Sequence, residues 1–77
     1  MIDWIEIIKN LKQKYYNNDY QTSLQFRDIE WWLKYKHPIE EIFENFHQYN
    51  KIVKKELKKL ERKKKLYEIY ENNNNKQ

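Results

Sequence analysis

Apolar residues recur at steps of three and four along most of this 77-residue chain, the spacing that gives a helix one apolar face. The chain has no glycine and a single proline, the two residue types that most often interrupt helices. Together these features predict an all-α protein. A chain this short makes at most one domain, so we expect a small three-helix bundle.

The first half of the chain predicts two helices. Asp3 can cap the first, over residues 4–16, because its carboxylate can accept a hydrogen bond from a free N–H at the helix start. Thr22 and Gln25 have the spacing of a capping box, so the second helix is expected over residues 23–36. The aromatic residues on the periodic faces are predicted to form the core, and these are Trp4, Phe26, Trp32, Phe43 and Phe46.

The second half predicts one long helix. Pro38 suits the first turn of a helix, and the apolar spacing then continues over residues 38–71. A continuous helix of that length measures about 50 Å, more than a small bundle can cover, so it either breaks near Asn50 or extends to a partner. Residues 72–77 are polar and predict a disordered tail after a single helical domain of residues 1–71.

Positive charge is concentrated in the predicted long helix. The chain carries +4 overall, but residues 1–50 hold six Lys or Arg against eight Asp or Glu, whereas residues 51–77 hold ten against four. At helical spacing most of these cations share one face, nearly opposite Val53. Such a ridge suits a phosphate backbone, because each neutralised phosphate releases counterions. We expect phosphate contacts from Lys51, Lys54, Lys55, Lys58, Lys59, Arg62 and Lys65.

Three other interpretations of this helix remain open. A lysine-rich face can simply keep an exposed helix hydrated. The apolar stripe opposite the lysines can form a homodimer, or dock on another protein if the chain is an adaptor or small inhibitor. A basic amphipathic helix can also lie on a membrane, although this stripe is narrow for that role. For a protein partner we predict contacts from Trp31, Tyr35, Leu57 and Leu60.

The sequence carries none of the motifs of a catalytic or cofactor site. Without cysteine there is no thiolate nucleophile, and without glycine there is no phosphate-cradling loop. His37 and His47 fit no metal-ligand spacing. We therefore expect no enzyme activity, no cofactor and no metal. The apolar runs are too short to span a membrane and the start lacks a secretory pattern, so we expect a cytoplasmic protein.

Residues 27–43 read RDIEWWLKYKHPIEEIF, and Tyr49, Val53 and Leu57 follow at four-residue steps. This stretch resembles the helix-turn-helix segment of the DnaD-like modules of bacterial replication proteins. Leu57 stands where that family has a tryptophan. The resemblance implies that the C-terminal part of the module contacts DNA, in agreement with the basic residues. Our hypothesis is a non-enzymatic accessory module that binds DNA or RNA, from a phage, plasmid or other mobile element.

Overall fold

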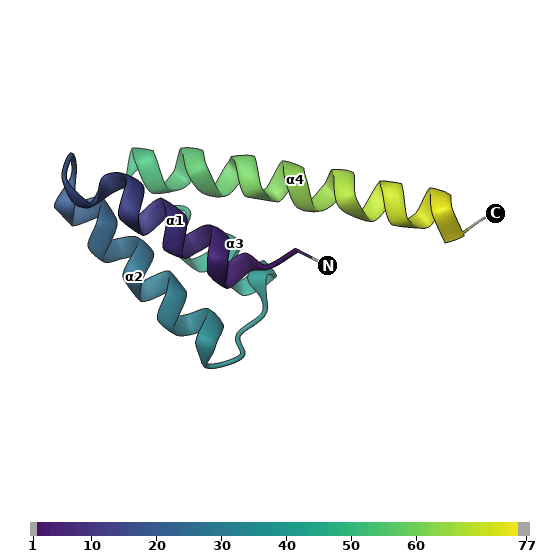
Figure 1. The fold of residues 1–77 in the computed structure, drawn as a ribbon, viewed down its shortest axis with the longest axis horizontal. Helices are drawn as coiled ribbons and strands as arrows, with labels where there is room; N and C mark the ends of the chain where they lie inside the picture. The colour runs from purple at the N-terminus through teal and green to yellow at the C-terminus, as the bar shows by residue number, and fades with distance from the viewer. Residues whose placement is uncertain (1, 76–77) are drawn as a thin grey trace.

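The computed structural model describes residues 2–75, in which four helices pack around one core (Figure 1). No strand is found in this part of the chain. The all-α prediction is therefore confirmed, but the number of helices is four instead of three, because the predicted third helix divides in two. The helices are α1 (Trp4–Tyr16), α2 (Tyr20–Lys34), α3 (Ile39–Phe46) and α4 (Lys51–Asn75).

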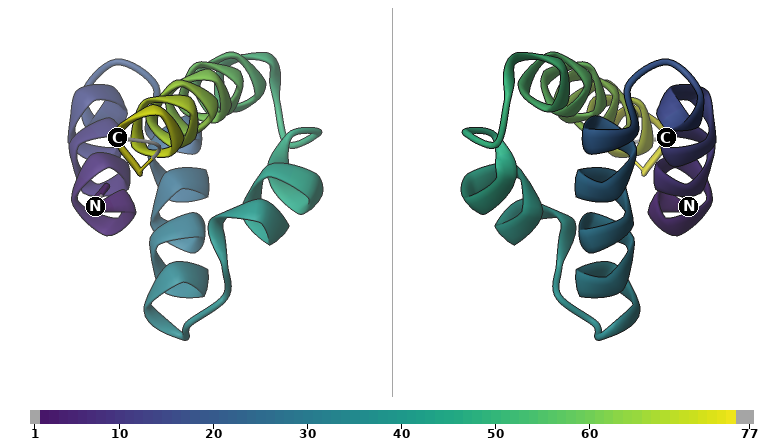
Figure 2. Two further views of the ribbon diagram at one scale, coloured as in Figure 1. Left: turned by 90° about the vertical axis from the view of Figure 1, so that its right-hand side faces the viewer. Right: turned by 90° about the vertical axis from the view of Figure 1, so that its left-hand side faces the viewer.

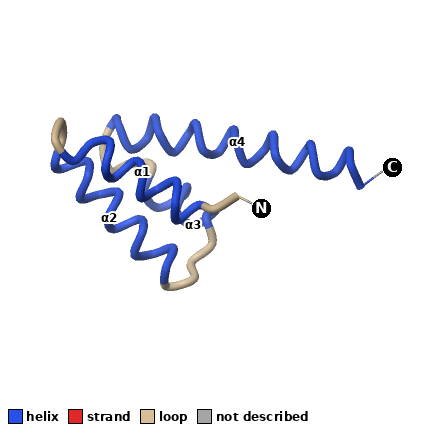
Figure 3. The backbone as a smooth tube through the Cα atoms, in the orientation of Figure 1, coloured by secondary structure: helices blue, strands red, loops and turns tan. Residues whose placement is uncertain are grey.

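Helices α1 and α2 form a hairpin joined by a tight turn (Figure 3). The carboxylate of Asp3 accepts a hydrogen bond from the Glu6 N–H, as predicted for the cap of α1. The start of α2 was predicted wrongly, because Asp19 caps it in place of Thr22. Asp19 accepts hydrogen bonds from both the N–H and the hydroxyl of Thr22, at 3.2 and 2.8 Å. An ionised carboxylate is the stronger acceptor, so the helix begins at Tyr20.

Helix α2 ends at Lys34, earlier than the predicted residue 36. Lys36 has a positive φ of 69°, its N–H bonds the Leu33 carbonyl, and the His37 N–H bonds the Trp32 carbonyl. These bonds form a Schellman motif, which usually places a glycine where Lys36 stands. Pro38 then precedes α3 as its cap, so the helix begins at Ile39, one residue after the predicted start.

The predicted long C-terminal helix is broken near Asn50, which was one of the two alternatives drawn from the sequence. Helix α3 ends at Phe46, and Asn50 starts α4 by accepting a hydrogen bond from the Val53 N–H at 2.7 Å. The Asn50 amide also donates to the Thr22 hydroxyl at 3.1 Å. We call the linked side chains of Asp19, Thr22 and Asn50 the Asn50 junction, because they join the starts of α2 and α4.

Buried side chains from all four helices form the core, and α4 runs at a steep angle to α2 (Figure 2). Phe26, Phe43 and Phe46 are buried as predicted, and Trp4 packs against the core with its ring edge-on to Phe43. Trp32 was assigned to the core wrongly, since it is 39% exposed and covers Phe46 from outside. The buried apolar residues are Ile8, Phe26, Ile29, Ile39, Ile42, Phe43, Phe46, Val53, Leu57 and Leu60.

The C-terminal half of α4 extends past the ends of the other three helices (Figure 1). The molecule consequently measures 46 × 23 × 20 Å. The helix continues to Asn75 instead of ending at Glu71, so residues 72–75 of the predicted disordered tail are helical. Lys76 and Gln77, the rest of that tail, lie outside the described residues. No helix in residues 2–75 combines the length and apolarity needed to cross a membrane.

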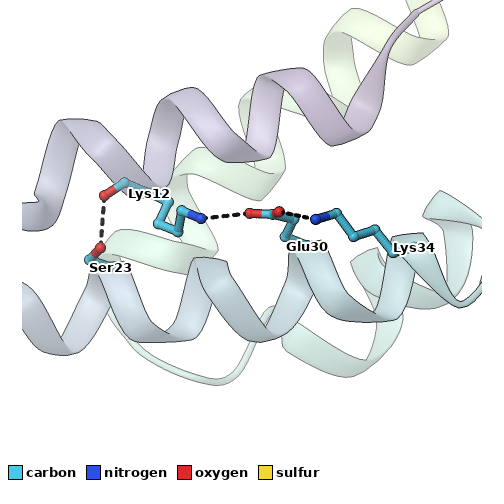
Figure 4. A network of polar contacts seen from close by, with 4 residues as sticks. All are labelled: Lys12, Ser23, Glu30 and Lys34. Carbon is cyan, nitrogen blue, oxygen red and sulfur yellow. Dashed lines mark hydrogen bonds and ion pairs between the residues drawn. The ribbon is translucent and has the colours of Figure 1, made fainter.

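A buried carboxylate holds α1 against α2 (Figure 4). Glu30 is 4% exposed, and its two oxygens each lie 2.8 Å from an ammonium, of Lys12 on α1 and of Lys34 one turn along α2. The Ser23 hydroxyl donates to the Lys12 carbonyl at 2.7 Å. Burial alone would raise the pKa of Glu30, but the hydrogen bonds and charges of the two lysines outweigh it and lower the pKa below 4.5.

The Asn50 junction is tested by Asn50→Ala. Loss of the α4 cap and of the donor to Thr22 should lower the free energy of unfolding by about 1–2 kcal/mol. Urea unfolding followed by helical circular dichroism measures this change. Gln48→Ala, at an exposed neighbouring position, is the control and should change it by less than about 0.5 kcal/mol. Equal effects of the two substitutions would contradict the structural role of the junction.

Glu30→Gln should lower the free energy of unfolding at pH 7 by about 1–2 kcal/mol, because it removes a charge that two lysines neutralise. Since the folded-state pKa of Glu30 is lowered, its stabilisation is full above about pH 4.5 and is lost as the pH falls through the folded-state pKa. Unfolding at a series of pH values should therefore show the wild type and the variant converging in acid. Glu44→Gln, an exposed control, should follow the wild type.

Candidate nucleic-acid interface

Helix α4 carries its positive charge on the side that faces away from the bundle. We call this side the basic face. Every residue predicted to contact phosphate is exposed, and Lys59 is the one that the described structure pairs with an acid, Glu56 at 3.3 Å. The basic face comprises Lys51, Lys54, Lys55, Lys58, Lys59, Arg62 and Lys65.

Burial of the opposite side of α4 sets the direction of the basic face. Val53, Leu57 and Leu60 are 0, 1 and 8% exposed and pack in the core. Because they lie nearly opposite the lysines on the helix, burying them turns the lysines outward. Leu57 and Leu60 were also predicted to bind a partner, and that assignment is wrong because the bundle itself covers both side chains.

Cations on the inner side of α4 are neutralised. Lys64, the one basic residue within the apolar stripe, lies 3.0 Å from Glu40 on α3 and also binds Glu68 one turn along α4. The hydrogen bonds to Glu68 and Glu40 raise the pKa of Lys64, and the bond from Lys64 lowers the pKa of Glu40. Lys64 therefore joins α3 to α4, and its charge is balanced within the protein.

An ion pair between Glu56 and Lys14 joins α4 to α1. Glu56 is buried beside the apolar stripe and lies 3.6 Å from the Lys14 ammonium and 3.3 Å from that of Lys59. Two separate contacts, to α1 through Lys14 and to α3 through Lys64, thus resist rotation of α4 about its axis. The basic face is held outward on both flanks.

Apolar residues that the sequence interpretation missed continue the basic face toward the C-terminal end. Leu66, Ile69 and Tyr70 are 68, 57 and 67% exposed. They follow Arg62 at steps of four, three and one, which places them on the same side of α4 as the lysines. This spacing from Arg62 could have placed the three residues on the basic side of α4 from the sequence alone. On the inner side at this end, a hydrogen bond to Glu71 raises the pKa of Tyr67.

Trp31 and Tyr35, the remaining residues predicted to contact a protein partner, are exposed and adjacent. Their ring centres are 5.1 Å apart at the C-terminal end of α2. They line a cleft of about 470 Å³, which we call the aromatic cleft. Its lining residues are Arg27, Asp28, Trp31, Trp32, Tyr35, His37 and Tyr49.

The two histidines make local contacts. His37 Nδ1 lies 2.9 Å from a carboxylate oxygen of Glu41, and His47 Nδ1 lies 2.7 Å from the Glu44 carbonyl. Within residues 2–75, no three His, Asp or Glu side chains gather as they would around a metal ion.

Comparison of the chain with protein-family models, with curated proteins and with solved structures found no match. The similarity of residues 27–57 to DnaD-like modules thus rests on the sequence pattern alone. Any functional assignment has to come from the geometry of the basic face and the aromatic cleft.

Two leucines of α4 test the division between its inner and outer sides. Leu57→Ala leaves a cavity in the core and should lower the free energy of unfolding by about 2–4 kcal/mol. Leu66→Ala truncates an exposed side chain and should change it by less than about 0.5 kcal/mol. Urea unfolding of both variants measures the difference. Similar losses in the two proteins would mean that α4 packs by another face.

Proposed function

We propose that this protein binds the phosphate backbone of a nucleic acid through the basic face of α4. The observation that supports the proposal most directly is the sorting of charge around this helix. Lys64 on its inner side is paired with Glu40 and Glu68, whereas the cations of the basic face other than Lys59 face solvent without an acidic partner in the described structure.

The dimensions of the basic face suit a nucleic-acid strand. From Lys51 to Lys65 the helix rises about 21 Å, at 1.5 Å per residue. A strand of B-form nucleic acid places one phosphate about every 3.4 Å along its axis, so roughly six phosphates fall within this length. Glu61 is the acidic side chain at the edge of the face, and its single negative charge is far smaller than the positive charge of the face.

Phosphate contacts alone give binding that is strongly salt-dependent and largely indifferent to sequence. The proposal is accordingly for an accessory module that holds DNA or RNA without reading base sequence. It needs no dimer, because the core of the monomer covers the stripe that suggested one. An exposed basic face can also be a hydrated surface without a ligand, and the measured affinity distinguishes the two.

The double variant Lys58→Gln/Arg62→Gln tests the proposal. Both residues lie on the basic face, one helical turn apart, so the variant should bind a 20-nucleotide DNA strand at least fivefold more weakly at 50 mM salt. The slope of log affinity against log salt should fall in magnitude by about 1.5, since two phosphate contacts are lost. Fluorescence anisotropy over a salt series provides both quantities.

The matched control is Lys9→Gln/Lys36→Gln, which removes the same charge from α1 and from the α2–α3 connection. Neither lysine has an ion pair within the described residues, and neither belongs to the basic face. The control should keep the wild-type slope and most of the affinity. Equal losses in the two double variants would show that net charge alone governs binding. Unchanged affinity of the Lys58/Arg62 variant would contradict the proposal outright.

A further inference from the structure

The aromatic cleft is a feature of the surface that phosphate binding does not use. Four of its aromatic side chains are exposed, Trp31, Trp32, Tyr35 and Tyr49, at 57, 39, 66 and 46%. Large exposed aromatic groups that gather around one hollow usually mark a binding site, because leaving them in water is unfavourable.

Two rings of the cleft, those of Trp32 and Tyr49, pack against the core. Trp32 packs edge-on against Phe46, with ring centres 5.5 Å apart. The ring centre of Tyr49 lies 4.7 Å from that of Phe46. The ring centre of His37 lies 4.5 Å from that of Trp32, and the His37 Nδ1 lies 2.9 Å from a carboxylate oxygen of Glu41. Since Phe46 is buried, these side chains form a rigid wall, and a ligand would meet surfaces that are already oriented.

The cleft lies beside the beginning of the basic face. Tyr49 belongs both to the cleft and to the turn between α3 and α4, and it precedes Lys51, the first cation of the basic face, by two residues. Figures 1 and 2 show that this turn leads directly into α4. A chain bound along the basic face and continuing past Lys51 would therefore reach the aromatic rings.

We propose that the aromatic cleft receives an unpaired base, so that the ligand of this protein is a single-stranded nucleic acid. The inference rests on the proposed function, because the basic face must hold the backbone from which the base projects. Trp31 and Tyr35 offer the stacking surface, and Arg27 can stack its guanidinium or bind a neighbouring phosphate. Asp28 can accept a hydrogen bond from an N–H group on the edge of a base, such as the imino N–H of thymine.

A duplex does not offer this ligand, because its bases are stacked on one another and paired. Extracting one base costs several kcal/mol unless the strand is already open. A proline-rich peptide can also dock on aromatic grooves, but it would make no use of the basic face next to the cleft. The continuity of the cleft with the start of the basic face at Tyr49 therefore favours a single strand.

The test compares two ligands of equal charge. One is a short oligo-thymidine strand, and the other is an abasic sugar-phosphate chain of the same length. Wild-type protein should bind the thymidine strand about tenfold more tightly, because stacking of one base contributes a factor of that order. Tryptophan fluorescence should be quenched by the thymidine strand and not by the abasic chain.

The variant Trp31→Ala/Tyr35→Ala should lose this preference while its binding to the abasic chain stays at the wild-type level. The control is Tyr16→Ala/Tyr20→Ala, which removes another exposed ring pair, with centres 5.5 Å apart at the α1–α2 turn, and it should keep the preference. Both pairs are exposed, so helical circular dichroism should show all three proteins folded.

Failure of the inference is distinguishable from failure of the proposed function. Equal, salt-dependent binding of both chains by wild-type protein would overturn the base site and leave the phosphate contacts standing. Binding of neither chain at low salt would overturn both. Tryptophan quenching by a proline-rich peptide but not by the thymidine strand would assign the cleft to a protein partner and overturn the inference.

Discussion

The placement of α4 depends on the Asn50 junction, where three polar side chains join the beginnings of two helices. Asn50 caps α4 and donates to Thr22, and Thr22 donates to Asp19, which caps α2. The junction fixes where α4 begins, and the starting residue of a helix decides which side chains face the core. If α4 began one residue later with the same direction, its apolar stripe would rotate by about 100°. The outward direction of the basic face is a consequence of this small network.

Electrostatic pairing distinguishes two groups among the lysines of this protein. Those that face the bundle meet glutamates, as Lys12 meets Glu30 and Lys64 meets Glu40. Those on the basic face lie in the solvent, where repulsion among neighbours on one helix opposes folding rather than aiding it. The proposed binding role would account for such a face on a small domain, since an anionic strand would relieve that repulsion. The apolar residues Leu66, Ile69 and Tyr70 extend the same side of α4 beyond the lysines and enlarge the surface available to a ligand.

The general fold follows from the sequence because helical periodicity is strong and glycine is absent. The first helix and the burial of Phe26, Phe43 and Phe46 were predictable on that ground, whereas the break near Asn50 was one of two alternatives. Helix ends were less so. The predicted ranges 4–16 and 23–36 leave Asp19 between the two helices, although its carboxylate caps α2. The end of α2 was also missed, because Lys36 has a positive φ at a position where glycine is the usual residue.

The surface could be predicted only in part, because periodicity gives relative directions on a helix but not what covers each side. The basic face was predictable from its spacing alone. Whether Leu57 and Leu60 meet their own bundle or a partner depends on where α3 ends, which spacing does not determine. Lys64 lies within the apolar stripe of α4, and spacing along one helix does not reveal that its partner, Glu40, lies on another helix. The aromatic cleft joins residues of α2 to Tyr49 in the α3–α4 turn, and only the fold brings them together.

The most direct test of the account is the reactivity of each lysine toward an amine-modifying reagent, read by mass spectrometry with and without a single DNA strand. Bound phosphates should protect Lys54, Lys55, Lys58 and Lys65, whereas Lys9 and Lys36 should react as they do in the free protein. Protection confined to the basic face is the predicted result. Equal protection of all exposed lysines, or protection of Lys9 and Lys36 alone, would contradict the claim that α4 presents the nucleic-acid-binding surface.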